Sequence, residues 1–446
     1  MNKNKDFRKT LCLTLMLSML MSLSGCAMLL QNARQQAEQN AQVDVEQESN
    51  ATESMEQEEA GKVADNSQSG NDNTATSQPS KAEEELMSGI FVNKMELLAD
   101  LVDQYYMNDI SVEDMRTGAY KGMMEGLGDP YTCYYTPEEY EDLMESTSGT
   151  YYGIGAVVQQ NLKTMYITIV KPYVDGPAYN AGMLPGDIIY MVDGVDVTGM
   201  EIDNVVTMMK GPEGTVVKVT VVREGVSDPI ELTITRGKIE IETIEYEMLD
   251  HNIGLITISS FDELTPAQYK AGIEELKAQG MKGLIIDLRD NGGGLLNSVV
   301  EMLDYVLEDG LIVYTEDKYG YREELYGDDK QKLDMPMVVM INGNSASASE
   351  IFAAAMQDYK AATLVGTTSF GKGIVQSIFP LTDGSAVKIT ISRYFTPRGV
   401  CIHGTGVTPN VEVELNEELK QMVVIPHDKD NQLTTAISVL LSEMQR

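Results

Sequence analysis

The sequence is poor in histidine, cysteine and basic residues. It has three histidines and four cysteines in 446 residues, and no histidine lies in an HExxH spacing. So few histidines disfavour a metal-dependent or histidine-based hydrolase. Four cysteines give neither a zinc pattern nor a dense disulfide framework. Against 69 Asp and Glu there are only 33 Lys and Arg, a net charge of −36, which argues against non-specific binding to nucleic acid.

Two of the four cysteines lie far apart in the body of the chain. A bridge between Cys133 and Cys401 is possible. Two isolated cysteines are more often buried thiols, which is the alternative that we favour.

The apolar run at the N-terminus, residues 11–23, is too short to span a bilayer comfortably. Basic residues between positions 3 and 9 precede it, an arrangement typical of an export signal. Its end, Leu23-Ser24-Gly25-Cys26, resembles the lipobox of bacterial lipoproteins, which implies cleavage before Cys26 and lipidation of its sulfur. The alternatives are a simple secretory signal and an uncleaved anchor. In each case we expect the body of the protein outside the cytoplasm, and acyl chains on Cys26 would hold it on the extracytoplasmic face of the cell membrane.

Low-complexity sequence follows this signal of residues 1–25. Residues 26–85 are rich in Gln, Asn, Ser, Glu and Ala and contain few large apolar side chains, so we expect a disordered acidic tether. Apolar residues then recur at helical spacing over 86–147. This pattern predicts a small helical domain, in which Ser111 can cap one helix and Pro137 can begin another.

Residues 148–236 alternate short β runs with turns. The string Gly176-Pro-Ala…Ala181-Gly182…Gly186-Asp187 closely resembles a bacterial PDZ domain. A PDZ domain adds an extended peptide as a strand, and it would hold the peptide's terminal carboxylate on the N–H groups of Gly153, Ile154 and Gly155. The alternative for that loop taken alone is an ordinary glycine-rich entry to a strand.

From residue 237 the pattern becomes strand, helix, strand, helix. Continuous apolar runs at Gly283–Leu288 and Met337–Ile341 are typical of buried parallel strands. We therefore expect an α/β core over 237–415, with loops gathered at one edge where sites form, and a C-terminal helical segment over 416–446.

The second of these runs leads into a serine-rich corner and a helical run. Ser345, Ser347 and Ser349 lie there, and Lys372 stands between two glycines 25 positions after Ser347. A hydroxyl is a weak nucleophile until a base removes its proton. A lysine serves as that base only when burial lowers its pKa. Ser347 and Glu350 also fit a capping box, which is the structural alternative.

Three motifs in this core resemble those of the carboxy-terminal processing (tail-specific) peptidases. They are Leu288–Gly294, Ser345–Glu350, and Phe370–Gly373 followed by Gln376. That family consists of serine endopeptidases with a PDZ domain inserted before a crotonase-like core. Asp129-Pro-Tyr-Thr132 also resembles the segment before its PDZ domain. Residues 404–411 look like its closing segment, with an asparagine where aspartate is common.

The resemblance implies a role for each matching residue. Ser347 would be the nucleophile, Lys372 the general base, and Gln376 the residue that orients the lysine. The N–H groups of Ala348 and Gly293 would bind the oxyanion. Ser345 and Ser349 are the competing nucleophiles.

We therefore expect a multidomain α/β protein whose crotonase-like protease core carries an inserted β-rich PDZ domain. Its function would be that of a lipid-anchored serine endopeptidase, without metal or organic cofactor, acting on proteins with free apolar C-termini. The alternatives are an inactive PDZ adaptor, an acyl-thioester enzyme on the same core, and a triad of His403 and Asp383 with a serine. The helical segment and the last helix could also form a homodimer interface.

Overall fold

The computed structural model describes residues 81–328, 332–422 and 425–445. The export signal, the predicted lipidation site Cys26 and nearly all of the predicted tether lie outside these residues. The described residues fall into two units, with residues 81–102 in the first and those from 103 onward in the second. Helix α2 (Lys81–Leu86) belongs to the first unit, so helical structure begins a few residues before the boundary predicted at residue 86.

The predicted helical segment contains α3 (Gly89–Tyr105), α4 (Val112–Glu125) and α5 (Pro137–Ser148). Ser111 caps α4 as expected, since its Oγ accepts from the Asp114 N–H at 3.2 Å. Helix α5 begins at Pro137 behind a capping box of Thr136 and Glu139. Neither α3 nor α4 has a buried residue, and most of their large apolar side chains, such as Ile90, Leu97 and Met123, are exposed.

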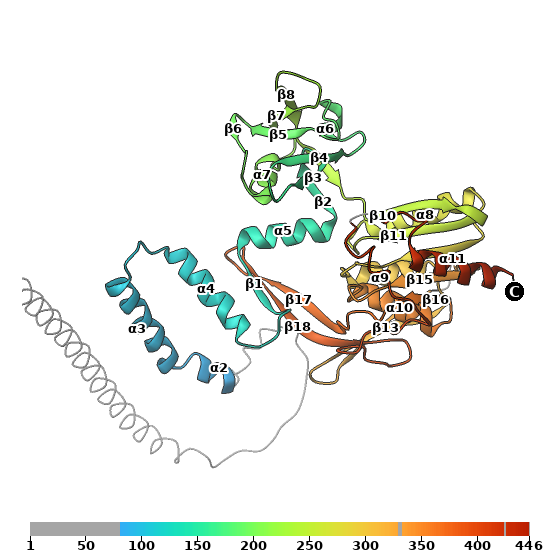
Figure 1. The fold of residues 1–446 in the computed structure, drawn as a ribbon. Coiled ribbons are helices and arrows are strands. Elements are labelled where there is room, and N and C mark those ends of the chain that lie inside the picture. The colour runs from blue at the N-terminus through green and yellow to red at the C-terminus, as the bar shows by residue number, and fades with distance from the viewer. Residues whose placement is uncertain (1–80, 329–331, 423–424, 446) are drawn as a thin grey trace, which may run out of the picture. The chain divides into compact units, whose positions relative to one another are not determined.

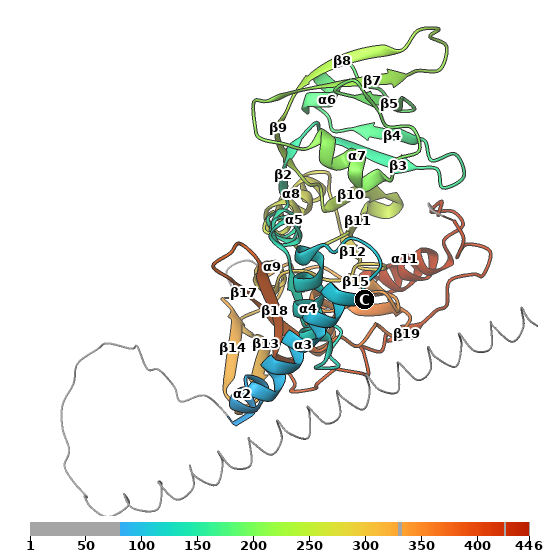
Figure 2. The same ribbon diagram turned by 90° about the vertical axis from the view of Figure 1, so that its left-hand side faces the viewer.

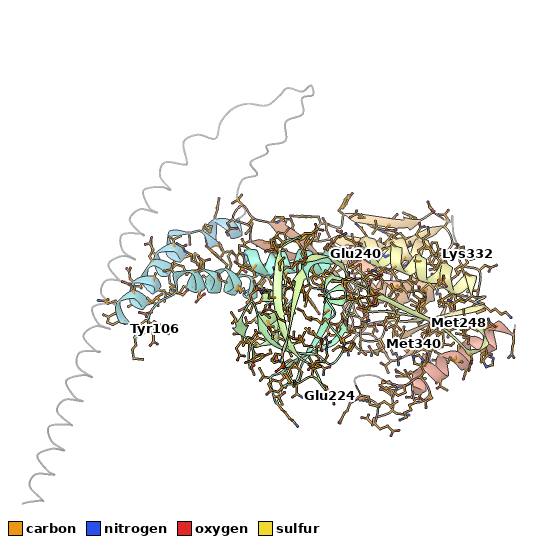
Figure 3. The ribbon with its side chains drawn as sticks, turned by 90° about the horizontal axis from the view of Figure 1, so that it is seen from above. Tyr106, Glu224, Glu240, Met248, Lys332 and Met340 are labelled. Atoms are coloured by element: carbon orange, nitrogen blue, oxygen red, sulfur yellow. The ribbon has the colours of Figure 1, made fainter. Side chains whose placement is uncertain are left out.

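The PDZ-like region forms its own sheet and its own core. The strand order is β3-β4-β5-β7-β8, with β6 beside β5, so β3 lies at one edge of this sheet. Fully buried side chains such as Val192, Val205 and Val219 fill the core. Glu224 lies outside it, in the turn between β7 and β8 (Figures 1 and 3). The elements are β3 (Ala156–Gln160), β4 (Ile167–Pro172), α6 (Pro177–Asn180), β5 (Ile188–Val192), β6 (Val195–Asp196), α7 (Ile202–Met209), β7 (Val216–Val222) and β8 (Ile230–Thr235).

Two short strands bracket this region. Strand β2 (Thr150–Gly153) pairs antiparallel with β9 (Gly237–Glu240). The chain therefore enters and leaves the PDZ-like region through neighbouring strands, which is what an inserted domain requires.

The main sheet of the core has the order β10-β11-β12-β15-β16-β19 and is parallel from β11 to β19. Side chains alternate between its two faces. Ile256 and Ile286 face the cluster that contains α8, α9 and α10, whereas Leu255 and Ile285 face α11. Met340, on the α11 side, is fully buried (Figure 3). The strands are β10 (Ile244–Leu249), β11 (Ile253–Ile258), β12 (Gly283–Asp287), β15 (Met337–Ile341), β16 (Thr363–Gly366) and β19 (Val411–Glu412).

The helices of this core are α8 (Thr265–Ala278), α9 (Leu296–Asp304), α10 (Ala348–Asp358) and α11 (Asn431–Met444), with a short 3₁₀ turn, η1 (Asp250–Asn252). Leu433 and Leu440 of α11 are buried against the sheet. The apolar face of the last helix is therefore packed inside the core, and its part in a dimer interface stays a prediction.

A second sheet, which sequence patterns did not predict, joins distant parts of the chain. Figure 1 shows β1 beside β17 and β18, and Figure 2 shows β13, β14, β17 and β18 together. Its order is β1-β18-β13-β14, and β17 also pairs with β18. Strand β1 comes from the helical segment, so that segment contributes directly to the sheet whose strand β17 begins two residues after the predicted base Lys372. The strands are β1 (Cys133–Tyr135), β13 (Gly310–Asp317), β14 (Arg322–Gly327), β17 (Ile374–Pro380) and β18 (Ala386–Phe395).

Cys133 and Cys401 are free thiols, as favoured, and are partly buried. Across the described ranges no helix combines the length and the apolarity needed to cross a bilayer.

Candidate active site

Ser347 lies where β15 has ended and α10 begins. Its backbone has φ 57° and ψ −116°, a left-handed conformation that costs a non-glycine residue on the order of 1–3 kcal/mol. Such strain persists where the surrounding structure fixes it, and it is characteristic of a nucleophile on a sharp strand-to-helix turn. The buried Tyr394 supports the turn, because its hydroxyl donates to the Ser347 carbonyl at 3.1 Å.

The three serines of this corner differ in their surroundings. Ser345 Oγ is buried and donates to the Leu288 carbonyl at 2.7 Å. Ser349 Oγ is buried and donates to the Asn291 carbonyl at 2.9 Å. Ser347 is only partly buried, and among the three it alone lines a cavity. The two competing hydroxyls therefore tie the corner to the neighbouring loop.

That neighbouring loop, residues 288–294, follows β12 and lies against Ser347. Asn291 fixes it: its Nδ2 donates to the Ile258 carbonyl at 2.7 Å, and its Oδ1 accepts from the Gly293 N–H at 2.8 Å. A Cβ on Gly293 would stand 2.6 Å from the Ala346 carbonyl oxygen and 2.8 Å from Ser347 Cβ. Only glycine fits at this approach, and its φ of 103° is also one that glycine tolerates.

The two predicted oxyanion donors differ in this structure. The N–H of Ala348, at the first position of α10, has no acceptor among the described residues. The N–H of Gly293 is already donated to Asn291 Oδ1. The N–H of Ala348 could therefore bind an oxyanion without rearrangement, whereas the N–H of Gly293 would first have to break its hydrogen bond to Asn291 Oδ1.

Glu350 connects the predicted nucleophile Ser347 to the loop of the predicted base Lys372. It is fully buried, and its Oε2 accepts from the N–H of Ser347 at 2.9 Å, as the capping box predicts. The same carboxylate also accepts from the Lys372 N–H at 2.8 Å. The bonds to Lys372 and its neighbours come from a segment far along the chain, and local sequence patterns gave no sign of them.

The amine of Lys372 lies in a partly buried, mixed environment. Its Nζ is 4.7 Å from the centre of the Tyr131 ring. Burial lowers the pKa of Lys372 and the positive charge of Lys388 lowers it further, while the carboxylates of Asp129 and Glu350 act in the opposite direction. The net direction is downward, as a general base requires.

Within the described structure, no hydrogen bond joins the Ser347 hydroxyl to the Lys372 amine, or Gln376 to that amine. Gln376 lies on β17 at a bulge, and its Nε2 is 3.4 Å from Thr390 Oγ1 of the paired strand. Catalytic hydrogen bonds are often long or absent in a site without substrate. Gln376 therefore lines the same cavity as Lys372 but contacts Thr390 and not the lysine amine.

One cavity of about 350 Å³ collects these groups. Its wall is mixed: apolar side chains from α5, α9 and β17 alternate with the polar groups already described. The lining residues are Leu143, Ser146, Thr147, Ser260, Phe261, Gly292, Gly294, Leu295, Leu296, Ser347, Ala348, Ile351, Lys372, Ile374, Val375, Gln376, Lys388 and Tyr394. This cavity brings together Ser347, Ala348, Lys372 and Gln376, whereas Gly293 does not line it, although both of its neighbours in the chain do.

The alternative residues for a triad are placed elsewhere. His403 is exposed and lines a different cavity, together with Asp129 and Arg393. Asp383 accepts from the N–H and the hydroxyl of Ser385 in a turn. Neither lines the cavity of Ser347.

The predicted carboxylate-binding loop lies next to the edge strand β3. Gly153, Ile154 and Gly155 are buried. The carbonyl of Ile154 accepts from Ala178 at 2.7 Å, and that of Gly155 accepts from Tyr173 at 3.0 Å. The N–H groups of Ile154 and Gly155 have no acceptor in the described part of the chain. Two such donors beside an open strand edge suit an anionic chain end.

Comparisons with known proteins agree with this arrangement. The model of peptidase family S41 matches residues 252–413, a PDZ domain model matches 168–223, and a model described as the activating protease CtpB N-terminal domain matches 19–139. The PDZ and S41 matches lie inside the segments predicted at 148–236 and 237–415, whose exact boundaries stay predictions.

Relatives match over most of the chain. The carboxy-terminal processing protease CtpA of Bacillus subtilis is 37% identical over 329 residues, which are 74% of this chain and 70% of the relative. The carboxyl-terminal-processing protease of Synechocystis is 33% identical over 344 residues, 76% of this chain and 80% of the relative. A solved structure, a photosystem II D1 C-terminal processing protease, is 28% identical, with 74% of this chain and 88% of that chain covered and a TM-score of 0.43.

The matching family models and the relatives from Bacillus subtilis and Synechocystis show that the chain belongs to the carboxy-terminal processing proteases of peptidase family S41, serine proteases that carry a PDZ domain.

Proposed function

We propose that this protein is a membrane-anchored endopeptidase that recognises the C-terminal tails of exported proteins through its PDZ domain and cleaves them with a dyad of Ser347 and Lys372. One observation carries the choice of nucleophile: of the three serines at the corner, only Ser347 lines the cavity that also contains Lys372. Its strained backbone at the start of α10 supports the same choice.

The chemistry would proceed in four moves. The neutral amine of Lys372 takes the proton of the Ser347 hydroxyl as the oxygen attacks the scissile carbonyl. The N–H of Ala348 binds the developing oxyanion, joined by that of Gly293 when it leaves Asn291. Lys372 then gives the proton to the leaving amine. A water molecule hydrolyses the acyl-enzyme with Lys372 acting as base once more.

Gln376 would orient the lysine in the active arrangement. It lies four residues along the chain from Lys372 and lines the same cavity. For this role its amide has to leave Thr390, to which it is joined only by a long contact of 3.4 Å.

Tail recognition would use the edge strand β3 and the loop before it. The unpaired N–H groups of Ile154 and Gly155 would hold the terminal carboxylate. Partly exposed apolar side chains of β3 and α7, among them Val158 and Val206, would contact the tail. These surroundings favour apolar C-terminal residues. The domain adds a strand to its sheet when a peptide binds in this way.

The anchor would be the lipidated Cys26. Lipidation at Cys26 would place the protease on the extracytoplasmic face of the membrane, where exported tails are found. The test is Cys26→Ala, which should move the protein from the membrane fraction to the soluble fraction. Retention of the variant in the membrane fraction would argue against the lipid anchor.

The exposed apolar residues of α3 and α4 support a second proposal, a homodimer. Neither helix buries a residue, and large exposed apolar faces mark interaction sites. Analytical ultracentrifugation should therefore show a dimer for the purified chain, and a concentration-independent monomer would refute this proposal.

The dyad is tested by measuring turnover, binding of a C-terminal peptide and covalent modification of Ser347 separately. Ser347→Ala and Lys372→Ala should each lower kcat on a tail-bearing protein by at least about a thousandfold. Binding of a fluorescent apolar C-terminal peptide should be retained by both variants. A serine-directed fluorophosphonate should modify Ser347 in the wild type. Substantial turnover by either purified variant would refute the dyad. Retained tail binding without turnover by the wild type would favour a PDZ adaptor.

A further inference from the structure

The acid beside the proposed nucleophile has an unusual position for a helix cap. Glu350 is fully buried, and no Lys, Arg or His forms an ion pair with it in the described residues. A buried carboxylate without a cation is costly unless several hydrogen bonds stabilise it. Its surroundings therefore have to supply donors in number.

Four donors surround this carboxylate. Oε2 accepts from the N–H groups of Ser347 at 2.9 Å and Lys372 at 2.8 Å. Oε1 accepts from the Gly371 N–H at 2.7 Å and from the Ser369 hydroxyl at 2.5 Å. A capping box needs only the first of these bonds. The other three come from a segment 19 to 22 positions further along the chain.

We propose that Glu350 is a positioning residue that fixes the nucleophile and the base relative to each other, because one of its oxygens bonds the backbone of both Ser347 and Lys372. This inference rests on the proposed dyad. The carboxylate is rigidly placed, since it lies one turn inside α10 and all four donors hold it. A loop held to a helix in this way carries its side chain to one place, which is what preorganisation of a catalytic pair requires.

The charge of Glu350 has a second consequence. When Lys372 takes the serine proton it becomes an ammonium, and the nearby carboxylate favours that charged form. The groups that act on the amine are burial, Lys388, Asp129 and Glu350, and the last two oppose the lowering of its pKa. Removing the charge of Glu350 should therefore lower the pKa of Lys372 further and move the acid limb of the pH–rate profile to lower pH.

The test uses the full chain with three variants. Glu350→Gln keeps the shape but replaces one accepting oxygen by an amide that faces N–H donors. Glu301→Gln, on the exposed face of α9, is the matched control for a lost carboxylate. Ser347→Ala reports on the dyad itself. We expect Glu350→Gln to lower kcat at least about 100-fold, with KM and tail binding unchanged and the acid limb at lower pH. The control should match the wild type throughout.

The outcomes separate the two proposals. If Glu350→Gln keeps kcat and the pH profile of the wild type while Ser347→Ala is inactive, the dyad stands and the role of Glu350 is wrong. If Ser347→Ala remains active, the dyad itself fails. Where circular dichroism shows that Glu350→Gln is not folded, Ser369→Ala replaces it, because it removes one of the four donors. That variant should lower kcat about tenfold and Ser369→Thr should restore it, and an unchanged kcat would overturn the proposal.

Discussion

Replacing Arg289 by methionine should destabilise the protease core more than removing any charged side chain from its surface would. Arg289 follows β12 and joins it to the start of α11. Its Nη2 lies 2.6 Å from Asp287 Oδ2 and 2.9 Å from Asp430 Oδ2. The arginine side chain is 15% exposed, and the two aspartates are 11% and 3% exposed. Methionine fills a similar volume but leaves both carboxylates without their cation.

The expected magnitude follows from this burial. Breaking a buried ion pair by removing one partner costs about 3–5 kcal/mol, since the remaining charge is left desolvated. We therefore expect Arg289→Met to lower the free energy of unfolding of the core by about 4 kcal/mol. Adding Asp430→Asn should recover part of this loss, because the two sites are in contact and their effects are not additive.

The assay is urea denaturation of the purified chain, followed by circular dichroism, with the transition of the core fitted separately from that of the PDZ domain. Arg398→Met is the matched control. Its side chain is 58% exposed, its Nε lies 3.8 Å from Asp358 Oδ1 and its Nη2 donates to the Asp358 carbonyl at 2.8 Å, so its loss should cost about 0–1 kcal/mol. A loss for Arg289→Met within about 1 kcal/mol of the control would refute this assignment of the buried network.

Two further changes test the cavity. Lys388→Met removes a positive charge that lowers the pKa of Lys372. That pKa should therefore rise, the acid limb of kcat/KM should move to higher pH, and activity at pH 7 should fall. Lys277→Met, on the exposed side of α8, is the control, and an acid limb at the same pH as in the wild type would contradict the effect of Lys388 on the pKa of Lys372. Gly293→Ala places a methyl group 2.6 Å from the Ala346 carbonyl oxygen and should reduce labelling of the nucleophile by a fluorophosphonate at least about 100-fold, whereas labelling at the wild-type rate would show that the loop can move away.

The parts of the fold that the sequence predicted are those with local signals. Buried parallel strands leave continuous apolar runs, so Met337–Ile341 was predicted with its exact bounds. Helix starts leave caps, so α4 and α5 were placed correctly at Ser111 and Pro137.

The second sheet had no such signal. Strand β18 mixes apolar residues with polar ones such as Lys388, Thr390 and Arg393, and most of its residues are only partly buried, so its sequence is not a continuous apolar run. Strand β1 has only three residues. Their pairing is set by tertiary contacts, which local patterns do not contain.

The candidate site shows the same limit. Motifs identified Ser347 and Lys372, and the cavity contains both. The motif of Glu350 predicted a helix cap, and that bond is present. Its bonds to the lysine loop depend on how α10 packs beside residues 369–372, and no spacing in the sequence encodes that. The hydrogen bond from the Gly293 N–H to Asn291 Oδ1 likewise depends on the folded loop, and no sequence pattern predicted it.

The pairing of β1 with β18 has a consequence for how the chain folds. Tyr135 and Lys388, joined by a hydrogen bond between their side chains, are 253 positions apart. The strand before the PDZ domain therefore has no partner until almost the whole chain has been made, and contacts of such long range form slowly. The core of the PDZ domain, by contrast, draws all its residues from Ile154 to Ile234. We expect the PDZ domain to fold first, while the protease core is still incomplete. Proteolytic activity should therefore arise only after the C-terminal third of the chain has packed onto the core.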